Sequence, residues 1–313
     1  MLGVLGKFGP ERAMSEQMFE NIAFFQSRHC SIKIAWSSFK SECEKGVILF
    51  LTGRAEYFLK YVPFFERMNA LGFTVFALDH RGQGASGRML PESEKGYVED
   101  FSFYVDDAED FLKNTVLEYA GKIPVFLVSH SMGGAVSLLL AARCPDLFTK
   151  IVFTSPMWGL IYDMPEFLVT TIVKGACRLG FGKFYALGKS AKDYLKPFEK
   201  THLTQSFENY MRQQKFVTEN PSFALGGPAF KWVCESMKAM EKLPEAAKKV
   251  KAPVLLVQAE NDTVVDNNAQ NIVAENLENC RKTLIEKGFH ELLNEEKEFY
   301  EKTISVISDF LLS

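Results

Sequence analysis

Ser131 lies in the run Val125–Gly134, V-F-L-V-S-H-S-M-G-G, which joins a candidate nucleophile to the small residues that such a nucleophile needs. The apolar residues before it predict a buried strand, and the residues after it predict a helix. A serine on a sharp strand-to-helix turn exposes its hydroxyl while its backbone is crowded. Ser129 and Gly133 flank it, where the usual G-x-S-x-G pattern has glycines. The strand and the helix make this short pattern a nucleophile elbow.

A serine hydroxyl becomes a good nucleophile near neutral pH when a base takes its proton and an acid orients that base. In this architecture the order along the chain is serine, acid, histidine. Asp262 follows an expected strand at 252–258, and His290 follows another at 281–286. We therefore predict that Ser131, Asp262 and His290 are catalytic. All three come just after the carboxyl ends of strands, where open α/β sheets bind their ligands.

Other acids and histidines of the chain could compete for the same roles. Glu260 and Asp266 share the loop of Asp262, but the spacing to the strand favours Asp262, and Asp266 precedes an amphipathic helix as an N-cap would. His130 is next to the nucleophile, and its side chain should point away from the serine hydroxyl. The remaining histidines are interpreted as structural: His29, His80 and His202.

Ester and amide hydrolysis also needs donors for the negative charge that develops on the carbonyl oxygen. The backbone N–H of Met132, directly after the nucleophile, is one expected donor. The second should come from the loop T-G-R-A-E-Y after an expected strand at 46–51. We predict the backbone N–H of Arg54, with Gly53 allowing an unusual backbone angle. The Arg54 side chain has two open interpretations, a contact for an acidic head group or a solvated surface arginine.

Together these residues resemble the α/β-hydrolase family, and more narrowly its bacterial lysophospholipase and monoacylglycerol lipase branch. The resemblance covers nearly the whole chain. Besides the elbow, it rests on L-T-G-R-A-E-Y, D-H-R-G-Q-G-A-S-G-R, A-L-G-G-P-A-F-K-W-V and N-D-T-V-V-D-N, at Leu51–Tyr57, Asp79–Arg88, Ala224–Val233 and Asn261–Asn267. The A-L-G-G-P run points to the lysophospholipase branch. Monoacylglycerol lipases usually begin the oxyanion loop with H-G, whereas Thr52 stands in the histidine position here.

The elements that must position these residues alternate between strand and helix patterns. A chain of 313 residues suits one large α/β domain with an insertion. We predict the α/β-hydrolase fold, a mostly parallel central sheet flanked by helices, with an early antiparallel strand within 30–39. Further strands are expected at 47–51, 74–78, 125–129, 150–154, 253–258 and 281–286, and helices near 56–71, 101–119, 131–143, 266–277 and 295–311.

The alternation stops at 156–243, which is rich in aromatic residues. We predict that this stretch is a helical cap, inserted between the two parts of the core at 1–155 and 244–313. It carries twelve Lys and Arg residues against eight Asp and Glu residues, although the net charge of the chain is −3. A basic, aromatic cap suits a substrate with an apolar chain and an anionic head, and a peripheral contact with a membrane surface. Alternatively, the aromatic residues only pack the cap against the core.

Composition narrows the partners and the compartment. The net charge of −3 gives no basic surface for nucleic acid. The six cysteines show no metal-binding spacing, so they are interpreted as free thiols. No apolar run reaches the roughly eighteen residues of a membrane span, and the run Met1–Pro10 is too short for a signal peptide. We expect a cytoplasmic protein, peripheral at most to the inner face of the membrane. The sequence carries no signal for an oligomeric state.

The motifs and the resemblance together predict a serine ester hydrolase of monoacyl lipids that works through an acyl-enzyme, without metal or organic cofactor. A lysophospholipid is the preferred substrate, ahead of a monoacylglycerol or a general carboxylic ester. A dehalogenase or epoxide hydrolase of this fold would need a carboxylate in place of Ser131. An aminopeptidase would need cap carboxylates for a substrate amine, such as Glu208, Glu219 or Glu235. The contrasting class is a lipid-binding protein without turnover, which a complete triad disfavours.

Overall fold

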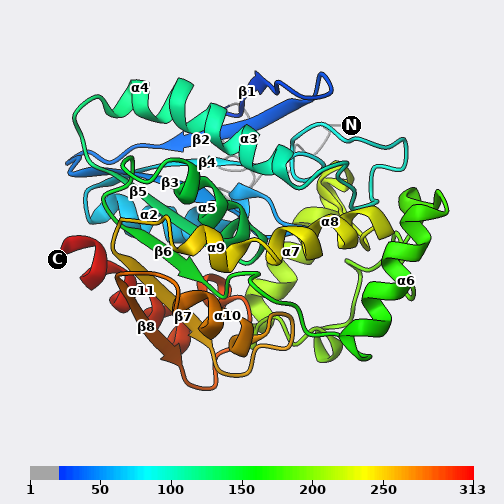
Figure 1. Cartoon of the computed structure of the whole chain (residues 1–313). Helices are drawn as coiled ribbons and strands as arrows, with labels where there is room; N and C mark the ends of the chain where they lie inside the picture. The colour runs from blue at the N-terminus through cyan, green and yellow to red at the C-terminus, as the bar shows by residue number, and fades with distance from the viewer. Residues whose placement is uncertain (1–20) are drawn as a thin grey trace, which may run out of the picture.

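Eight strands form one mixed sheet in the computed structural model, which describes residues 21–313 (Figure 1). Their order across the sheet is β1-β2-β4-β3-β5-β6-β7-β8. The first two strands are antiparallel to their neighbours, and the other six are parallel to one another. The strands are β1 (Ala23–Gln26), β2 (Lys33–Phe39), β3 (Gly46–Leu51), β4 (Phe73–Leu78), β5 (Val125–His130), β6 (Ile151–Thr154), β7 (Val254–Ala259) and β8 (Cys280–Ile285).

Helices cover both faces of the sheet, so β3 to β7 are buried along their whole length and consist almost entirely of apolar residues. On one face, the apolar residues of the sheet pack against α2 (Val62–Ala70) and α11 (Lys297–Leu312). The opposite face packs against α3 (Ser102–Phe111), α5 (Met132–Arg143), α9 (Leu243–Ala247) and α10 (Asn267–Ala274). This two-sided core fixes the carboxyl ends of the parallel strands, where the candidate site residues follow.

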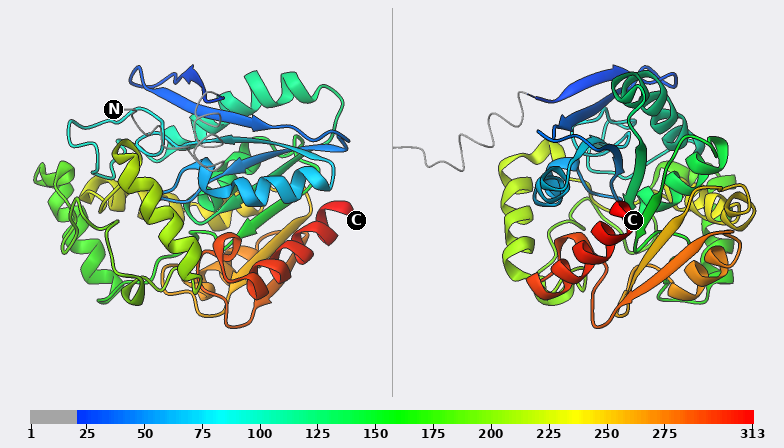
Figure 2. Two further views of the ribbon diagram at one scale, coloured as in Figure 1. Left: turned by 180° about the vertical axis from the view of Figure 1, so that it is seen from behind. Right: turned by 90° about the vertical axis from the view of Figure 1, so that its left-hand side faces the viewer.

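Residues 156–243 contribute no strand to this sheet. They form three helices and several short 3₁₀ turns, and Figures 1 and 2 show the helices gathered at the end of the molecule away from the C terminus. The helices are α6 (Glu166–Arg178), α7 (Phe207–Glu219) and α8 (Phe230–Met240).

The predicted fold class is confirmed, and the expected strands lie within about one residue of the observed ones. The expected helix at 101–119 is interrupted, because a π-helical turn at Leu112–Val116 separates α3 from α4 (Leu117–Ala120). The short edge strand β1 was not predicted. Its four residues alternate between partly buried and exposed side chains, which is too little pattern to recognise.

The sequence raised two expectations about membranes, one about a signal peptide and one about a membrane-spanning helix. The run Met1–Pro10, interpreted above as too short for a signal peptide, lies outside the described residues. Between residues 21 and 313, no helix is both long enough and apolar enough to cross a membrane.

Candidate active site

Ser131 occupies the turn between β5 and α5 with φ +50° and ψ −119°, a conformation that L-residues rarely adopt. Its small neighbours have a direct steric reason. A Cβ atom on Gly133 would collide with the backbone carbonyl of Leu51, and one on Gly134 would collide with Pro156. The glycines after the serine therefore let α5 begin hard against the ends of β3 and β6, as the elbow pattern predicted.

The structure brings the three predicted residues Ser131, Asp262 and His290 together. His290 Nε2 lies 3.0 Å from Ser131 Oγ, and His290 Nδ1 lies 2.7 Å from Asp262 Oδ2. The other carboxylate oxygen, Oδ1, accepts the backbone N–H groups of Val264 at 2.8 Å and Val265 at 2.9 Å. With its proton on Nδ1 facing the carboxylate, the imidazole presents Nε2 to accept the serine proton.

The electrostatics of the pair suit a base held by an ionised acid. Burial by itself would lower the pKa of His290, but the Asp262 carboxylate outweighs it, and the pKa is raised above 6.5. Burial would likewise raise the pKa of Asp262, yet the imidazole and the two backbone N–H groups keep it below 3.8. The side chains are 5% and 0% exposed, so water screens their interaction little.

The competing acids and His130 have other partners. Asp266 caps α10 by accepting the backbone N–H of Asn268 at 2.8 Å. The exposed Glu260 accepts the backbone N–H of Lys287 at 2.8 Å. The Nδ1 atom of His130 lies 3.1 Å from a β6 carbonyl oxygen, and burial drives its pKa well below 6.5. The predicted N-cap role of Asp266 is confirmed.

The loop that carries Arg54 is held by an amide from the D-H-R-G-Q-G run. Gln83 Nε2 donates to the Gly53 carbonyl at 2.6 Å, and Gln83 Oε1 accepts the Ala55 N–H at 3.2 Å. In a trans peptide the N–H points opposite to the carbonyl, so anchoring the Gly53 carbonyl also sets the direction of the Arg54 N–H. That N–H meets no acceptor in the described part of the chain.

The physical reason predicted for Gly53, an unusual backbone angle, is wrong. The left-handed φ of this loop, +60°, belongs to Ala55. Gly53 is needed for space, because an added Cβ would lie 2.5 Å from Glu56 Oε2 and 3.1 Å from Ser131 Cβ. The loop therefore packs directly against the nucleophile.

A buried ionic cluster, which the sequence did not predict, ties this loop to the histidine loop. Lys60 Nζ lies 2.6 Å from Glu56 Oε1 and 2.9 Å from Glu291 Oε1, and its side chain is 2% exposed. Glu56 Oε2 accepts the Gly53 N–H at 2.5 Å and the Tyr61 hydroxyl at 2.7 Å. Burial would lower the pKa of Lys60, but the two carboxylates outweigh it and the pKa is raised.

Aromatic side chains of 156–243 lie over the same loop. Tyr57 stacks on Phe216 of α7, with ring centroids 4.6 Å apart, and meets Phe223 edge-on at 5.5 Å. The guanidinium of Arg54 reaches further along, to Gly226 and to the ring of Trp232. The segment 224–233 singled out in the sequence thus contacts the candidate oxyanion loop directly.

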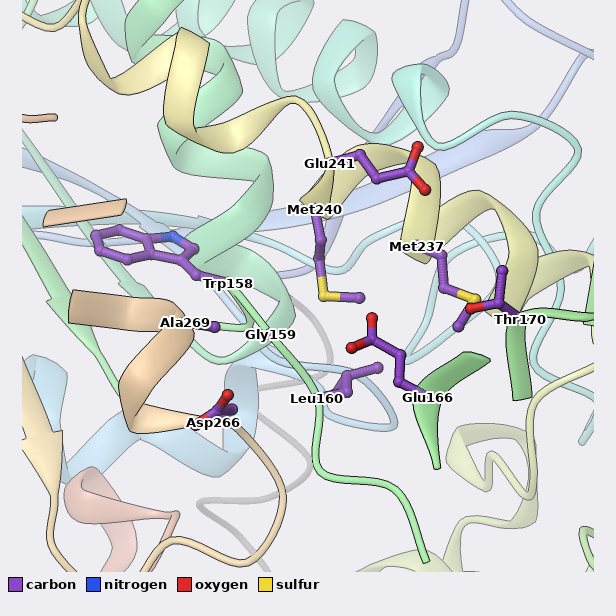
Figure 3. Close-up of a pocket in the computed structure, with 10 residues that line it drawn as sticks. All are labelled: Trp158, Gly159, Leu160, Glu166, Thr170, Met237, Met240, Glu241, Asp266 and Ala269. Atoms are coloured by element: carbon purple, nitrogen blue, oxygen red, sulfur yellow. The ribbon is translucent and has the colours of Figure 1, made fainter. Parts of the chain in front are cut away.

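A separate hollow of about 230 Å³ lies where α6 and α8 meet the loop after β6 and the start of α10. Figure 3 shows Met237, Met240 and Glu166 converging on it from the two helices. None of the three candidate catalytic residues lines it. Across residues 21–313, no group of three or more His, Cys, Asp and Glu side chains is arranged to hold a metal ion.

Comparison with known proteins places the chain. A family model described as serine aminopeptidase, S33, matches residues 42–297. The chain belongs to this family of α/β-hydrolases. Lysophospholipase L2 of Escherichia coli (strain K12) is 33% identical to this S33 hydrolase over 287 residues, which span 89% of this chain and 84% of that protein. Monoglyceride lipase of Rattus norvegicus is 29% identical over 267 residues, 85% of this chain and 80% of the lipase.

Solved structures share the fold of this S33 hydrolase. A monoacylglycerol lipase of Paleococcus ferrophilus matches with a TM-score of 0.70 at 23% identity, covering 89% of this chain and 98% of that one. A soluble variant of monoglyceride lipase from Saccharomyces cerevisiae matches with a TM-score of 0.74 at 18% identity, covering 92% and 94%. The predicted resemblance is therefore confirmed at the level of fold and family.

Proposed function

We propose that this S33 hydrolase is a serine ester hydrolase of monoacyl lipids, and foremost a lysophospholipase that releases a fatty acid and a glycerophosphodiester. The observation that carries the proposal is the placement of the His290 imidazole between Ser131 Oγ and the Asp262 carboxylate. The choice of substrate is supported by 33% identity to a protein named lysophospholipase L2.

The proposed reaction proceeds through an acyl-enzyme. Ser131 Oγ attacks the ester carbonyl carbon while its proton passes to His290 Nε2, and Asp262 stabilises the resulting imidazolium. The backbone N–H groups of Arg54 and Met132 donate to the oxyanion. The intermediate collapses, the alcohol leaves with the proton from His290, and a water molecule then releases the fatty acid by the same steps in reverse roles. The mechanism needs no metal or organic cofactor.

The other functions considered differ in what supports them. Monoacylglycerol hydrolysis is the second candidate, supported by the 29% identity to a monoglyceride lipase. A general carboxylesterase would use the same chemistry. For an aminopeptidase, Glu208 and Glu219 are exposed, and Glu235 is paired with Lys231 at 3.3 Å and Lys238 at 2.7 Å. These three carboxylates do not form one amine-binding cluster, which favours an ester substrate.

We further propose that 156–243 is a cap whose outer surface touches a lipid bilayer. Of the sixteen large apolar side chains that are exposed within 21–313, eleven belong to this stretch, including Phe167 at 68% and Leu179 at 75% exposure. Exposed cations such as Arg178 and Lys183 lie beside them. Apolar anchors flanked by basic residues favour an anionic leaflet, such as the cytoplasmic face. All six cysteines are free thiols, which fits a reducing compartment.

Sedimentation with vesicles of anionic phospholipid tests this contact. The double variant Phe167→Ser, Leu179→Ser should lower the bound fraction at least several-fold, because it removes two apolar anchors. Ile272→Ser on α10 is the matched control, since Ile272 is equally apolar and 57% exposed but lies outside the cap. Equal binding by the double variant and the control would refute the membrane contact.

A substrate panel tests the proposed activity. The purified full chain is assayed with a lysophospholipid, a monoacylglycerol of the same acyl chain, p-nitrophenyl esters and aminoacyl anilides. The proposal predicts turnover of the lipid esters, with the lysophospholipid first. Cleavage of anilides in preference to esters would establish an aminopeptidase instead. Lipid binding without any turnover would establish a carrier.

A further inference from the structure

Arg54 belongs to the loop that packs against the candidate nucleophile, and its guanidinium is a cation without a carboxylate partner among the residues that the structure describes. It donates from Nη2 to the Gly226 carbonyl at 2.6 Å, and its Nε is buried with no acceptor in the described residues. No Asp or Glu side chain between residues 21 and 313 forms an ion pair with it, and the nearby Asp193 is already bonded to Ser190. Burial lowers the pKa of Arg54 to about 10, so the group stays charged at neutral pH.

The A-L-G-G-P-A-F-K-W-V run supplies the two residues that contact this guanidinium, Gly226 and Trp232. Trp232 lies under the guanidinium, with Cζ 4.9 Å from the ring, and the indole N–H donates to the Tyr104 hydroxyl at 3.2 Å. Gly96 opens the space on another side, since a Cβ there would collide with Arg54 Nη2. Gly96 also exchanges backbone hydrogen bonds with the run, at Gly227 and Ala229. A stacked, pre-oriented guanidinium loses little freedom when it binds an anion.

A guanidinium in this environment has no partner for its positive charge unless an anion binds to it, and the unpaired charge costs free energy. Arg54 is partly buried, and a charge that is withdrawn from water without a partner is destabilising. The Gly226 carbonyl and the Trp232 ring compensate only part of the charge of Arg54. Its Nε–H group has no hydrogen-bond acceptor within residues 21–313. Guanidinium groups bind phosphate through two parallel N–H···O bonds, which Nε and an Nη of one arginine can supply.

We propose that the Arg54 guanidinium, seated on Gly226 and Trp232, binds the phosphate group of the substrate, so that this side chain selects lysophospholipids over monoacylglycerols. The inference rests on the proposed ester hydrolase function and names the substrate class of that site.

The covalent geometry of the substrate fits this assignment. The backbone N–H of Arg54 is the proposed donor to the ester carbonyl oxygen, and its side chain extends away from that point. In a lysophospholipid the glycerol unit separates the ester carbonyl carbon from phosphorus by about as many bonds as separate Cα from Cζ in arginine. One residue can therefore contact the ester with its backbone and the phosphate with its side chain. A monoacylglycerol offers a neutral hydroxyl at that place.

The test compares kcat/KM for a lysophospholipid and for the monoacylglycerol of the same acyl chain, presented in the same micelles. Arg54→Met should lower the ratio of the two values about ten- to hundred-fold, because charge-assisted hydrogen bonds to the phosphate are lost. Any disturbance of the backbone donor affects both esters and cancels in the ratio. Arg54→Lys should lie between, since lysine keeps the charge without the planar fork.

Two further variants separate binding of phosphate from a merely structural role. Gly96→Ala leaves Arg54 in the chain but pushes its guanidinium, so it should lower the same ratio. Lys95→Met is the matched control, because the substitution removes an equal charge and leaves the Arg54 guanidinium untouched. The Lys95 ammonium lies over the Tyr185 ring, 4.8 Å from its centroid. The ratio for Lys95→Met should change about two-fold at most, because the Lys95 charge is already paired with Glu92 at 3.5 Å.

Inhibition of p-nitrophenyl ester hydrolysis by glycerol 3-phosphate and by inorganic phosphate provides a second readout. Glycerol 3-phosphate should inhibit the wild type, and Arg54→Met should weaken that inhibition at least ten-fold. If inhibition by inorganic phosphate depends on Arg54 but Arg54→Met leaves the ratio of the two lipid kcat/KM values unchanged, the proposal is overturned. The guanidinium would then bind free anions and not the phosphate group of the substrate. An equal loss on both lipids would overturn the proposal as well, and the ester hydrolase function would stand. Absence of turnover on every ester would instead refute that function.

Discussion

Replacing Asp262 by Asn makes a sharp test, because the structure dictates how the asparagine must sit. The backbone N–H groups of Val264 and Val265 both point at the position of Oδ1. The asparagine carbonyl oxygen will occupy it, which turns the side-chain NH₂ group toward His290 Nδ1. Nδ1 must then accept a hydrogen bond, so the ring proton moves to Nε2 and faces Ser131. In that tautomer the imidazole cannot take the serine proton.

The expected cost follows from the chemistry of such triads. The corresponding substitution in a serine protease lowers kcat about ten-thousand-fold while leaving the geometry intact, which corresponds to about 5 kcal/mol of barrier. We expect a loss of that order for Asp262→Asn, measured as kcat on a p-nitrophenyl ester. The circular dichroism spectrum should match the wild type.

Asp266→Asn is the matched control in the same loop. It exchanges one hydrogen bond acceptor for another at the N-cap of α10 and leaves the imidazole untouched. It should cost well under 1 kcal/mol of stability and little activity, since asparagine is also a favoured N-cap residue. An Asp262→Asn enzyme with more than a tenth of wild-type activity would refute the role of Asp262, and so would a large loss in the control.

Lys60→Met should lower the free energy of unfolding by about 3–5 kcal/mol, because Glu56 and Glu291 are left as unpaired buried carboxylates. Denaturant titrations measure this loss, and an unchanged free energy of unfolding would contradict the prediction. Wild-type kcat/KM should fall as pH drops through the raised pKa of His290, above 6.5. In Asp262→Asn, the fall in the rate of fluorophosphonate labelling at acid pH should move to lower pH, because the carboxylate no longer raises the pKa of His290. An unchanged pH dependence would contradict this effect of Asp262 on His290. Across p-nitrophenyl esters, kcat/KM should rise about a hundred-fold over four added methylenes, at about 0.8 kcal/mol each, whereas a preference for acetyl esters would leave a small-ester carboxylesterase.

Local patterns made much of the site predictable. The elbow is readable because steric crowding forces small residues at fixed offsets from Ser131, as Gly133 and Gly134 demonstrate. Asp262 and His290 could be predicted because each comes shortly after an expected strand, and parallel strands bring such positions to one edge of the sheet.

The parts that escaped prediction depend on contacts between distant segments. Glu56 and Lys60 stand four residues apart, as in many surface helices, and nothing in the sequence marks Glu291 as their third partner. The contacts of the Arg54 guanidinium with Gly226 and Trp232 form only when the segment 224–233 packs on the oxyanion loop. Gly53 was recognised as special for the wrong reason, because its need for space comes from Glu56 and Ser131.

Covalent labelling of Ser131 tests the central claim most directly. A fluorophosphonate probe added to the full chain should modify one serine, located by mass spectrometry in the peptide that contains Ser131. Ser131→Ala should abolish both the labelling and lipid ester turnover, a loss on the order of a million-fold in a related serine hydrolase. Labelling at Ser129 or elsewhere, or turnover that survives in Ser131→Ala, would contradict the account.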